Sequence, residues 1–190
     1  MKTLFRVCCV ATFLALASPI AVAQEIVHAL SGTVTSVNPK IRMLEITTDD
    51  GSSGHFEWSK KSGGAVDFDK NVKADAIEVE QFTAKGNHVI VYYTGQGQIR
   101  TAVAVHDLGA VTVEKINGTV IKLNRHEHSL TIKNSSGAEQ SFHLDAKTVG
   151  DTATGVAEDM KYDFNKGDAV TVTAAQANGG ETALLIAPAM

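Results

Sequence analysis

Histidines are the side chains in this sequence best suited to chemistry, and two of them stand together in the segment His126-Glu127-His128. Imidazoles two residues apart at the start of a strand point to one side, and such a pair can bind a borderline metal such as copper or zinc. No third ligand is evident nearby, because His143 alternates with Phe142 on the next predicted strand and is expected to face outward. We therefore take His126 and His128 as candidate metal ligands, with a solvated turn as the alternative.

Three aromatic residues are the candidate ligand-binding side chains: Trp58, Tyr92 and Tyr93. Consecutive residues of a strand point to opposite faces, so one tyrosine is expected in a core and the other at the surface. The exposed tyrosine would be free to stack on a ligand. Trp58 alternates with Phe56, and the alternative for this tryptophan is a place in the core.

Patterns typical of catalytic or cofactor-binding sites do not occur in the sequence. It contains no nucleophile elbow, no His-Glu-x-x-His and no glycine-rich phosphate loop. The adjacent carboxylates Asp49-Asp50 precede Gly51, a context in which Asp favours turns for backbone reasons. We therefore expect neither catalytic activity nor a cofactor, and keep a weak hydrolase acting on a sugar or peptide as an alternative.

The first 23 residues have the features of an export signal. Lys2 and Arg6 precede an uncharged apolar run over 7–17, and Ala21-Val22-Ala23 predicts cleavage directly after it. The run is shorter than the roughly 20 residues that span a bilayer, and a retained N-terminal anchor is the alternative. We predict a signal peptide over 1–23 and a mature protein in the periplasm or outside the cell, without stable membrane insertion.

Loss of this segment changes the composition in two ways. Both cysteines, Cys8 and Cys9, lie in it, so the mature chain has no disulfide and no thiolate ligand. Without Lys2 and Arg6, 15 of the 17 basic residues remain against 21 acidic ones, a net charge of −6. Because a negative protein is poorly suited to a phosphate backbone, we expect no nucleic-acid partner. A small molecule, a glycan or another protein is the expected partner.

The remaining chain contains two similar halves. Ser31-Gly32-Thr33-Val34 has a counterpart in Asn117-Gly118-Thr119-Val120, and the same offset places Phe56 on Phe142. A slightly shorter offset relates the later landmarks, as the deletion of a few residues in one loop would produce. A period of this length indicates a tandem repeat of one small unit.

Within each half, apolar residues alternate with polar ones, as in strands with one buried face. Three such strands, an irregular stretch and two more strands are the order expected of a five-stranded OB-like barrel with a short helix or loop between strands three and four. We therefore predict an all-β fold of two tandem OB-like domains, 24–108 and 109–190, with an open sandwich of the same strand order as the alternative. The connector from Asp107 to Lys115 is short, so the domains are expected to touch.

These landmarks resemble those of a family of exported bacterial OB-like domains of unknown function, present here as a tandem pair. The resemblance rests on Gly-x-Val-x-x-Val-Asn beginning at Gly32, Leu-x-Ile beginning at Leu44, Phe-x-Trp beginning at Phe56, Gly-Asp-x-Val-x-Val beginning at Gly167, and a late Thr-Ala. It implies an OB-like fold and carries no catalytic residues.

A more distant resemblance is to the small periplasmic copper and silver carriers, which use a histidine, two methionines and a tryptophan around a similar barrel. It implies a metal site at Met43, His55 and Trp58 of the first half. The second methionine has no counterpart, and in the second half Ser129 and Leu144 replace Met43 and Trp58.

The expected function is therefore that of an exported, non-catalytic binding or structural module of unknown ligand. A periplasmic metal-binding protein using surface histidines and a weak hydrolase are the alternatives. The halves differ most between strands three and four, Ser62 to Glu80 against Thr148 to Lys161. Neutral drift also produces such divergence, but loops are where function is usually added. We expect a ligand to contact the first half, through Ser62 to Glu80 and the exposed one of Tyr92 and Tyr93.

Overall fold

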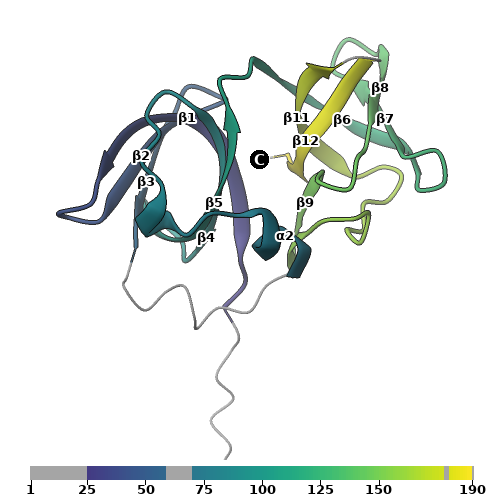
Figure 1. Ribbon diagram of the computed structural model, residues 1–190. Helices are drawn as coiled ribbons and strands as arrows, with labels where there is room; N and C mark the ends of the chain where they lie inside the picture. Colours follow the sequence, from purple (N-terminus) through teal and green to yellow (C-terminus); the bar gives the residue numbers. More distant parts are fainter. Residues whose placement is uncertain (1–24, 59–69, 178–179, 190) are drawn as a thin grey trace, which may run out of the picture.

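The computed structural model describes residues 25–58, 70–177 and 180–189, and these form two β-sheets side by side (Figure 1). The predicted signal peptide, 1–23, lies outside the described residues. No helix within the three described ranges is long and apolar enough to cross a membrane.

The first sheet is a closed barrel with the strand order β1-β2-β3-β5-β4, in which β4 pairs again with β1. Only β3 and β5 pair in parallel; the other neighbours are antiparallel. This confirms the predicted five-stranded barrel. Its strands are β1 (His28–Asn38), β2 (Met43–Thr48), β3 (Ser53–Glu57), β4 (His88–Thr94) and β5 (Ile99–Gly109). The expected short helix between strands three and four is present as α2 (Lys70–Asp75), followed by the one-turn helix η1 (Val79–Gln81).

Alternating side chains fill this barrel. Leu44, Ile46 and Phe56 are almost completely buried in its core, as their spacing predicts. Gly32 of β1 pairs with β2 on one side and β4 on the other. A Cβ atom at this position would lie 2.4 Å from the carbonyl oxygen of Thr47, so any other residue there would force the paired strands to shift.

The second sheet has the order β10-β9-β12-β11-β6-β7-β8, with an additional pairing between β12 and β8. Its strands are β6 (Val113–Asn124), β7 (Ser129–Asn134), β8 (Glu139–His143), β9 (Val149–Thr152), β10 (Gly155–Ala157), β11 (Ala169–Ala177) and β12 (Gly180–Pro188). Strands β6, β7, β8, β12 and β11 follow the order seen in the first barrel. A hairpin, β9–β10, takes the place of the expected helix or loop between strands three and four. It forms because β9 pairs with β12 and because Val149 and Val156 are buried.

The landmarks shared by the two halves occupy matching places. Phe56 and Phe142, with exposed fractions of 0% and 1%, lie in the cores of the first barrel and the second sheet, as predicted. The turns that lead into β2 and β7 also agree, since Arg42 and His128 have positive φ angles of 55° and 51°.

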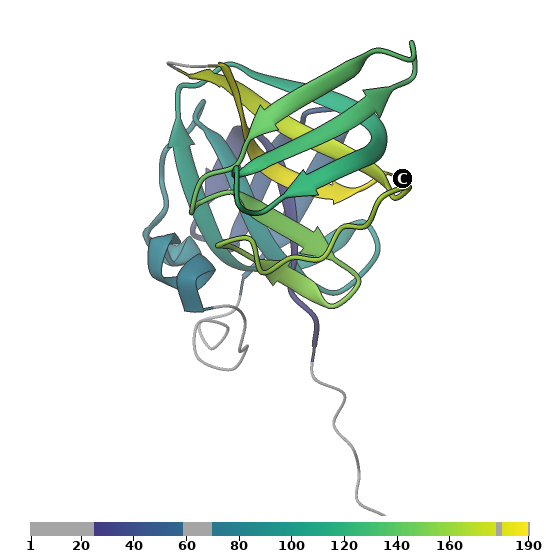
Figure 2. The ribbon, with the colours of Figure 1, turned by 90° about the vertical axis from the view of Figure 1, so that its right-hand side faces the viewer.

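A third apolar cluster, which we call the junction, lies between the two sheets. The first barrel contributes the outer face of β4, chiefly Ile90 and Tyr92, and the second sheet contributes Val149, Val156 and Leu185. In Figure 2 the second sheet lies in front of the first barrel and covers this face. The expectation that the two halves touch is thus met through apolar packing.

Candidate functional site

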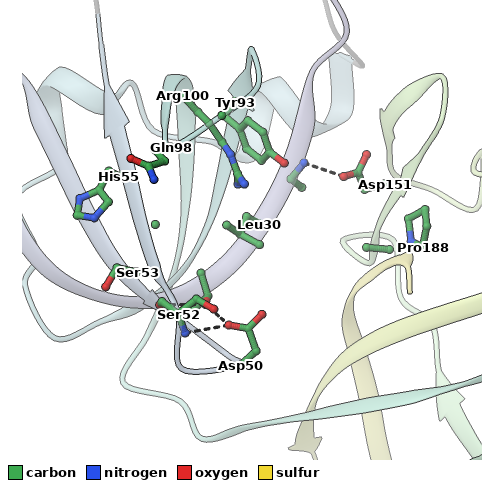
Figure 3. Close-up of a pocket in the computed structure, with 15 residues that line it drawn as sticks. Leu30, Asp50, Ser52, Ser53, His55, Tyr93, Gln98, Arg100, Asp151 and Pro188 are labelled. Carbon is green, nitrogen blue, oxygen red and sulfur yellow. Dashed lines mark hydrogen bonds between the residues drawn. The ribbon is translucent and has the colours of Figure 1, made fainter. Parts of the chain in front are cut away.

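A cleft of about 670 Å³ opens beside the first barrel, where the end of β12 approaches it (Figure 3). The first barrel lines it with residues of β1, β3 and the β2–β3 and β4–β5 hairpins. The second sheet adds Asp151 of β9 and Ala187 and Pro188 of β12. Both halves therefore build the cleft, and its size lies in the range of roughly 300–1,000 Å³ that small-molecule pockets occupy.

Tyr93 and Arg100 line the cleft side by side. The β4–β5 hairpin turns through Gly95 and Gly97, whose φ angles of 84° and 99° favour glycine, and its register sets Tyr93 opposite Ala102. Arg100, two residues before Ala102, is therefore the diagonal neighbour of Tyr93. Its guanidinium lies 4.7 Å from the centroid of the Tyr93 ring, so it covers one face of that ring. Burial raises the pKa of Tyr93, which remains a neutral hydroxyl.

Asp50, at the tip of the β2–β3 hairpin, is a fixed negative charge at the edge of the cleft. Its Oδ1 accepts hydrogen bonds from the Thr48 hydroxyl at 2.6 Å and the Ser52 backbone N–H at 2.9 Å. Lys115 of β6 lies 3.3 Å from the other oxygen. Hydrogen bonds from Ser52 and Thr48 are the main causes that hold the pKa of Asp50 far below its usual range. This carboxylate therefore stays ionised and cannot serve as a proton donor.

Asp151 forms the opposite wall and ties β9 to β1. Its Oδ1 lies 2.9 Å from Nδ1 of His28, and its Oδ2 accepts a hydrogen bond from the Ala29 backbone N–H at 3.1 Å. Burial raises the pKa of Asp151, while the contacts with Ala29 and His28 oppose that rise. The carboxylate thus holds the two halves together beside the cleft.

A buried polar group between the first barrel and β11 consists of Ser31, Asp49, His88 and Thr173. The hydroxyls of Ser31 and Thr173 both donate to Oδ2 of Asp49, the second at 3.1 Å. Nε2 of His88 lies 3.3 Å from Oδ1 of Asp49 without forming a hydrogen bond to it. Burial lowers the pKa of His88, against the attraction of Asp49. A nucleophilic serine would have to bond to the histidine, but Ser31 bonds to Asp49, and no member of the group lines the cleft. These hydrogen bonds therefore have a structural role and link β1 to β11.

Of the three predicted ligand-binding aromatics, only Tyr93 lines the cleft. Trp58 is 5% exposed and fills the core of the first barrel, which was the alternative for it. Neither tyrosine is fully exposed. Tyr92 is completely buried because the second sheet covers its face of β4, and Tyr93 is half-buried. Within the predicted segment from Ser62 to Glu80, residues 62–69 lie outside the described part, and 70–80 do not line the cleft.

The predicted metal ligands, His126 and His128, are both exposed in the turn between β6 and β7. His128 has a φ of 51°, so it precedes the regular strand, and strand alternation does not fix its direction. His143 is exposed, as expected. Among the described residues no three or more His, Cys, Asp or Glu side chains are grouped so that they could hold a metal ion. The assignment of His126 and His128 stays a prediction.

The residues implied by the resemblance to copper and silver carriers are not gathered at one place. Trp58 lies in the barrel core, whereas the His55 side chain is 41% exposed and lies 3.7 Å from Glu45. Met43 pairs with Glu57, two residues along β3 from His55, on the face that alternates with buried Leu44.

Sequence reasoning missed Arg100, Asp50 and Asp151 as residues of the cleft. A signal for Arg100 was present, since a hairpin through Gly95 and Gly97 places it diagonally across from Tyr93. Asp151 carried no such signal, because it reaches the cleft only through the packing of one half against the other.

The fold and the cleft define an all-β protein with a closed OB-like barrel and a small-molecule-sized cleft at its side. No family model and no curated protein matches the chain. Among solved structures, the chain is similar to a crystal structure of CusF with Ag(I), at 14% identity and a TM-score of 0.33, covering 41% of this chain and 99% of that one. A likeness of this level supports no argument about ligand or activity.

Proposed function

We propose that the chain is an exported, non-catalytic binding protein that holds a small molecule in the cleft beside Tyr93. The observation that supports this most is the cleft itself, which both halves line and which has the volume of a small-molecule site. Its lining combines the apolar surfaces of Leu30 and Pro188 with the polar groups of Ser53 and Gln98. Such a mixture suits a ligand with an apolar body and a few hydrogen-bonding groups.

The state of the two carboxylates that line the cleft, Asp50 and Asp151, favours binding over catalysis. A general acid or base needs a pKa near the working pH and access to the substrate. Asp50 is held ionised by Thr48, Ser52 and Lys115, and Asp151 is engaged with the first strand. His88 is 4% exposed and does not line the cleft.

The other parts of the proposal rest on the sequence and on the strand order. The features of 1–23 support export to the periplasm or beyond. The recurrence of one strand order in β1–β5 and in β6, β7, β8, β12 and β11 supports descent from a duplicated OB-like unit. In this proposal the second unit acts as a wall of the cleft and as a brace for the first barrel.

A substitution that fills the cleft tests the proposal. Ala187 of β12 lines the cleft, whereas Ala153 is exposed in the turn between β9 and β10. The full mature chain, its Ala187→Trp variant and the control Ala153→Trp are purified from the native host and weighed by native mass spectrometry. We expect a bound small molecule on the wild type and the control but not on Ala187→Trp. An adduct of equal occupancy on all three, or none on the wild type, contradicts the proposal.

A further inference from the structure

Among the described residues, Arg100 differs from Asp50 and Asp151 of the cleft in having no ion-pair partner. It is the only lysine or arginine among the described residues that line the cleft. In the described part of the chain, its side chain makes a cation–π contact with Tyr93, in which Cζ lies 4.7 Å from the ring centroid. A half-buried guanidinium without an anion beside it is costly, and an anionic ligand would relieve that cost.

Neither of the two carboxylates that line the cleft forms an ion pair with Arg100, because each one interacts with other groups. Asp50 lies 3.3 Å from Lys115 and accepts hydrogen bonds within its own turn. Asp151 is held by His28 and the backbone of Ala29 on the opposite wall. Among the described residues of the cleft, neither carboxylate therefore pairs with the positive charge of Arg100.

The shape of a guanidinium also favours one kind of anion. The Cζ atom of Arg100 lies over the ring of Tyr93, 4.7 Å from its centroid. A planar fork of parallel N–H donors matches a carboxylate, which it binds with two hydrogen bonds. Figure 3 shows Arg100 beside Tyr93, with Gln98 and His55 to one side and Leu30 below. Leu30 offers an apolar surface next to the charged group.

We propose that the ligand of this cleft is a small carboxylate with an apolar body, whose carboxylate binds the guanidinium of Arg100 while the body lies toward Leu30 and Pro188. The inference rests on the proposed function and names its ligand class. The cleft of about 670 Å³ is large enough for a molecule well beyond acetate in size. Arg100 is the residue that distinguishes an acid from its neutral amide.

Two matched pairs of probes test the inference on the full mature chain: benzoate with benzamide, and hexanoate with hexanamide. Dissociation constants are measured by NMR titration at low ionic strength for the wild type, Arg100→Gln, Arg100→Lys and the control Arg42→Gln. Arg42 is exposed, carries the same charge and does not line the cleft. Thermal unfolding of each variant reports whether it is folded.

We expect the acids to bind the wild type and Arg42→Gln alike, and Arg100→Gln about tenfold to a hundredfold more weakly. Arg100→Lys should fall between them, because an ammonium keeps the charge but loses the fork. Amides that bind as tightly as the acids, or acids that bind Arg100→Gln as tightly as the wild type, overturn the inference. If the same compounds bind the wild type but no longer bind the Ala187→Trp variant, the proposed function still stands. If no probe binds the wild type, the carboxylate assignment fails, and the adduct measurement decides the proposed function separately.

Discussion

Nδ1 of His28 on β1 lies 2.9 Å from Oδ1 of Asp151 on β9, and this pair joins the first barrel to the second sheet. The other oxygen of Asp151 accepts a hydrogen bond from the backbone of Ala29, so one carboxylate fixes two consecutive residues of β1. Both Asp151 and Ala29 line the cleft. The packing of the two halves therefore sets the shape of the candidate ligand site.

The pH dependence of stability should report the burial of Asp151. Its pKa is raised above the ordinary value of 3.8, so the folded protein binds this proton more tightly than the unfolded chain. The resulting stabilisation is present below pH 3.8 and is lost as the pH rises through the folded pKa. In Asp151→Asn this dependence is absent, while an oxygen acceptor remains for Ala29. The stability of the variant relative to the wild type, from urea unfolding between pH 3.5 and 8, should rise with pH and then level off. A flat or falling difference would refute this.

Loss of the Thr173 hydroxyl should weaken the buried hydrogen bonds between the first barrel and β11. Thr173→Val keeps the shape of the side chain but leaves Asp49 without one of its two hydroxyl donors in a buried setting. We expect a loss of about 1–3 kcal/mol in the free energy of unfolding, measured in denaturant. Thr171→Val on the same strand is the control. Its hydroxyl bonds to Asn117 at an exposed site, so its effect should stay within about 0.5 kcal/mol. Equal losses of unfolding free energy in the two variants would contradict a stabilising role for the buried hydrogen bond of Thr173.

A methyl group at Gly32 should strain the first barrel. Its Cβ would lie 2.4 Å from the Thr47 carbonyl oxygen, and backbone cannot yield as a flexible side chain does. We expect Gly32→Ala to cost about 3 kcal/mol or more, at or above the upper end of ordinary overpacking. Gly51→Ala separates this clash from backbone strain, since Gly51 has a φ of 84° but open space around it. That control should cost about 1–2 kcal/mol. A smaller loss at Gly32 than at Gly51 would contradict the packing argument.

Phe56 and Phe142 should be equally important in their own cores. Both are almost completely buried, so truncation to alanine leaves a large cavity in either half. Each substitution is expected to cost about 3–5 kcal/mol, measured by thermal or denaturant unfolding of the full chain. A loss below about 1 kcal/mol at either position would show that its core closes around the cavity.

The barrel could be predicted because it depends on local patterns. Alternation around Leu44 and Leu130 and the turn at Gly51 determine strands and hairpins from neighbouring residues alone. The hairpin β9–β10 was harder to predict, since its strands are short and depend on pairing with β12.

The cleft was predicted less well for a related reason. From the sequence, Tyr92 was as good a candidate as Tyr93. Strand alternation places the two side chains on opposite faces of the strand, but it does not show which face another part of the protein covers. The second sheet covers Tyr92, and this packing cannot be read from a local pattern. The same packing brings Asp151 to Tyr93 from a distant part of the chain.

The place of β12 in the molecule has a consequence for biosynthesis. This strand supplies Leu185 to the junction and Ala187 and Pro188 to the cleft, yet it follows the other described strands in the sequence. Until it emerges, the outer face of β4 with Ile90 and Tyr92 lacks part of its apolar cover. A nascent chain halted before β12 would therefore be a substrate for chaperones, and the cleft would take its final form only once β12 has been synthesised.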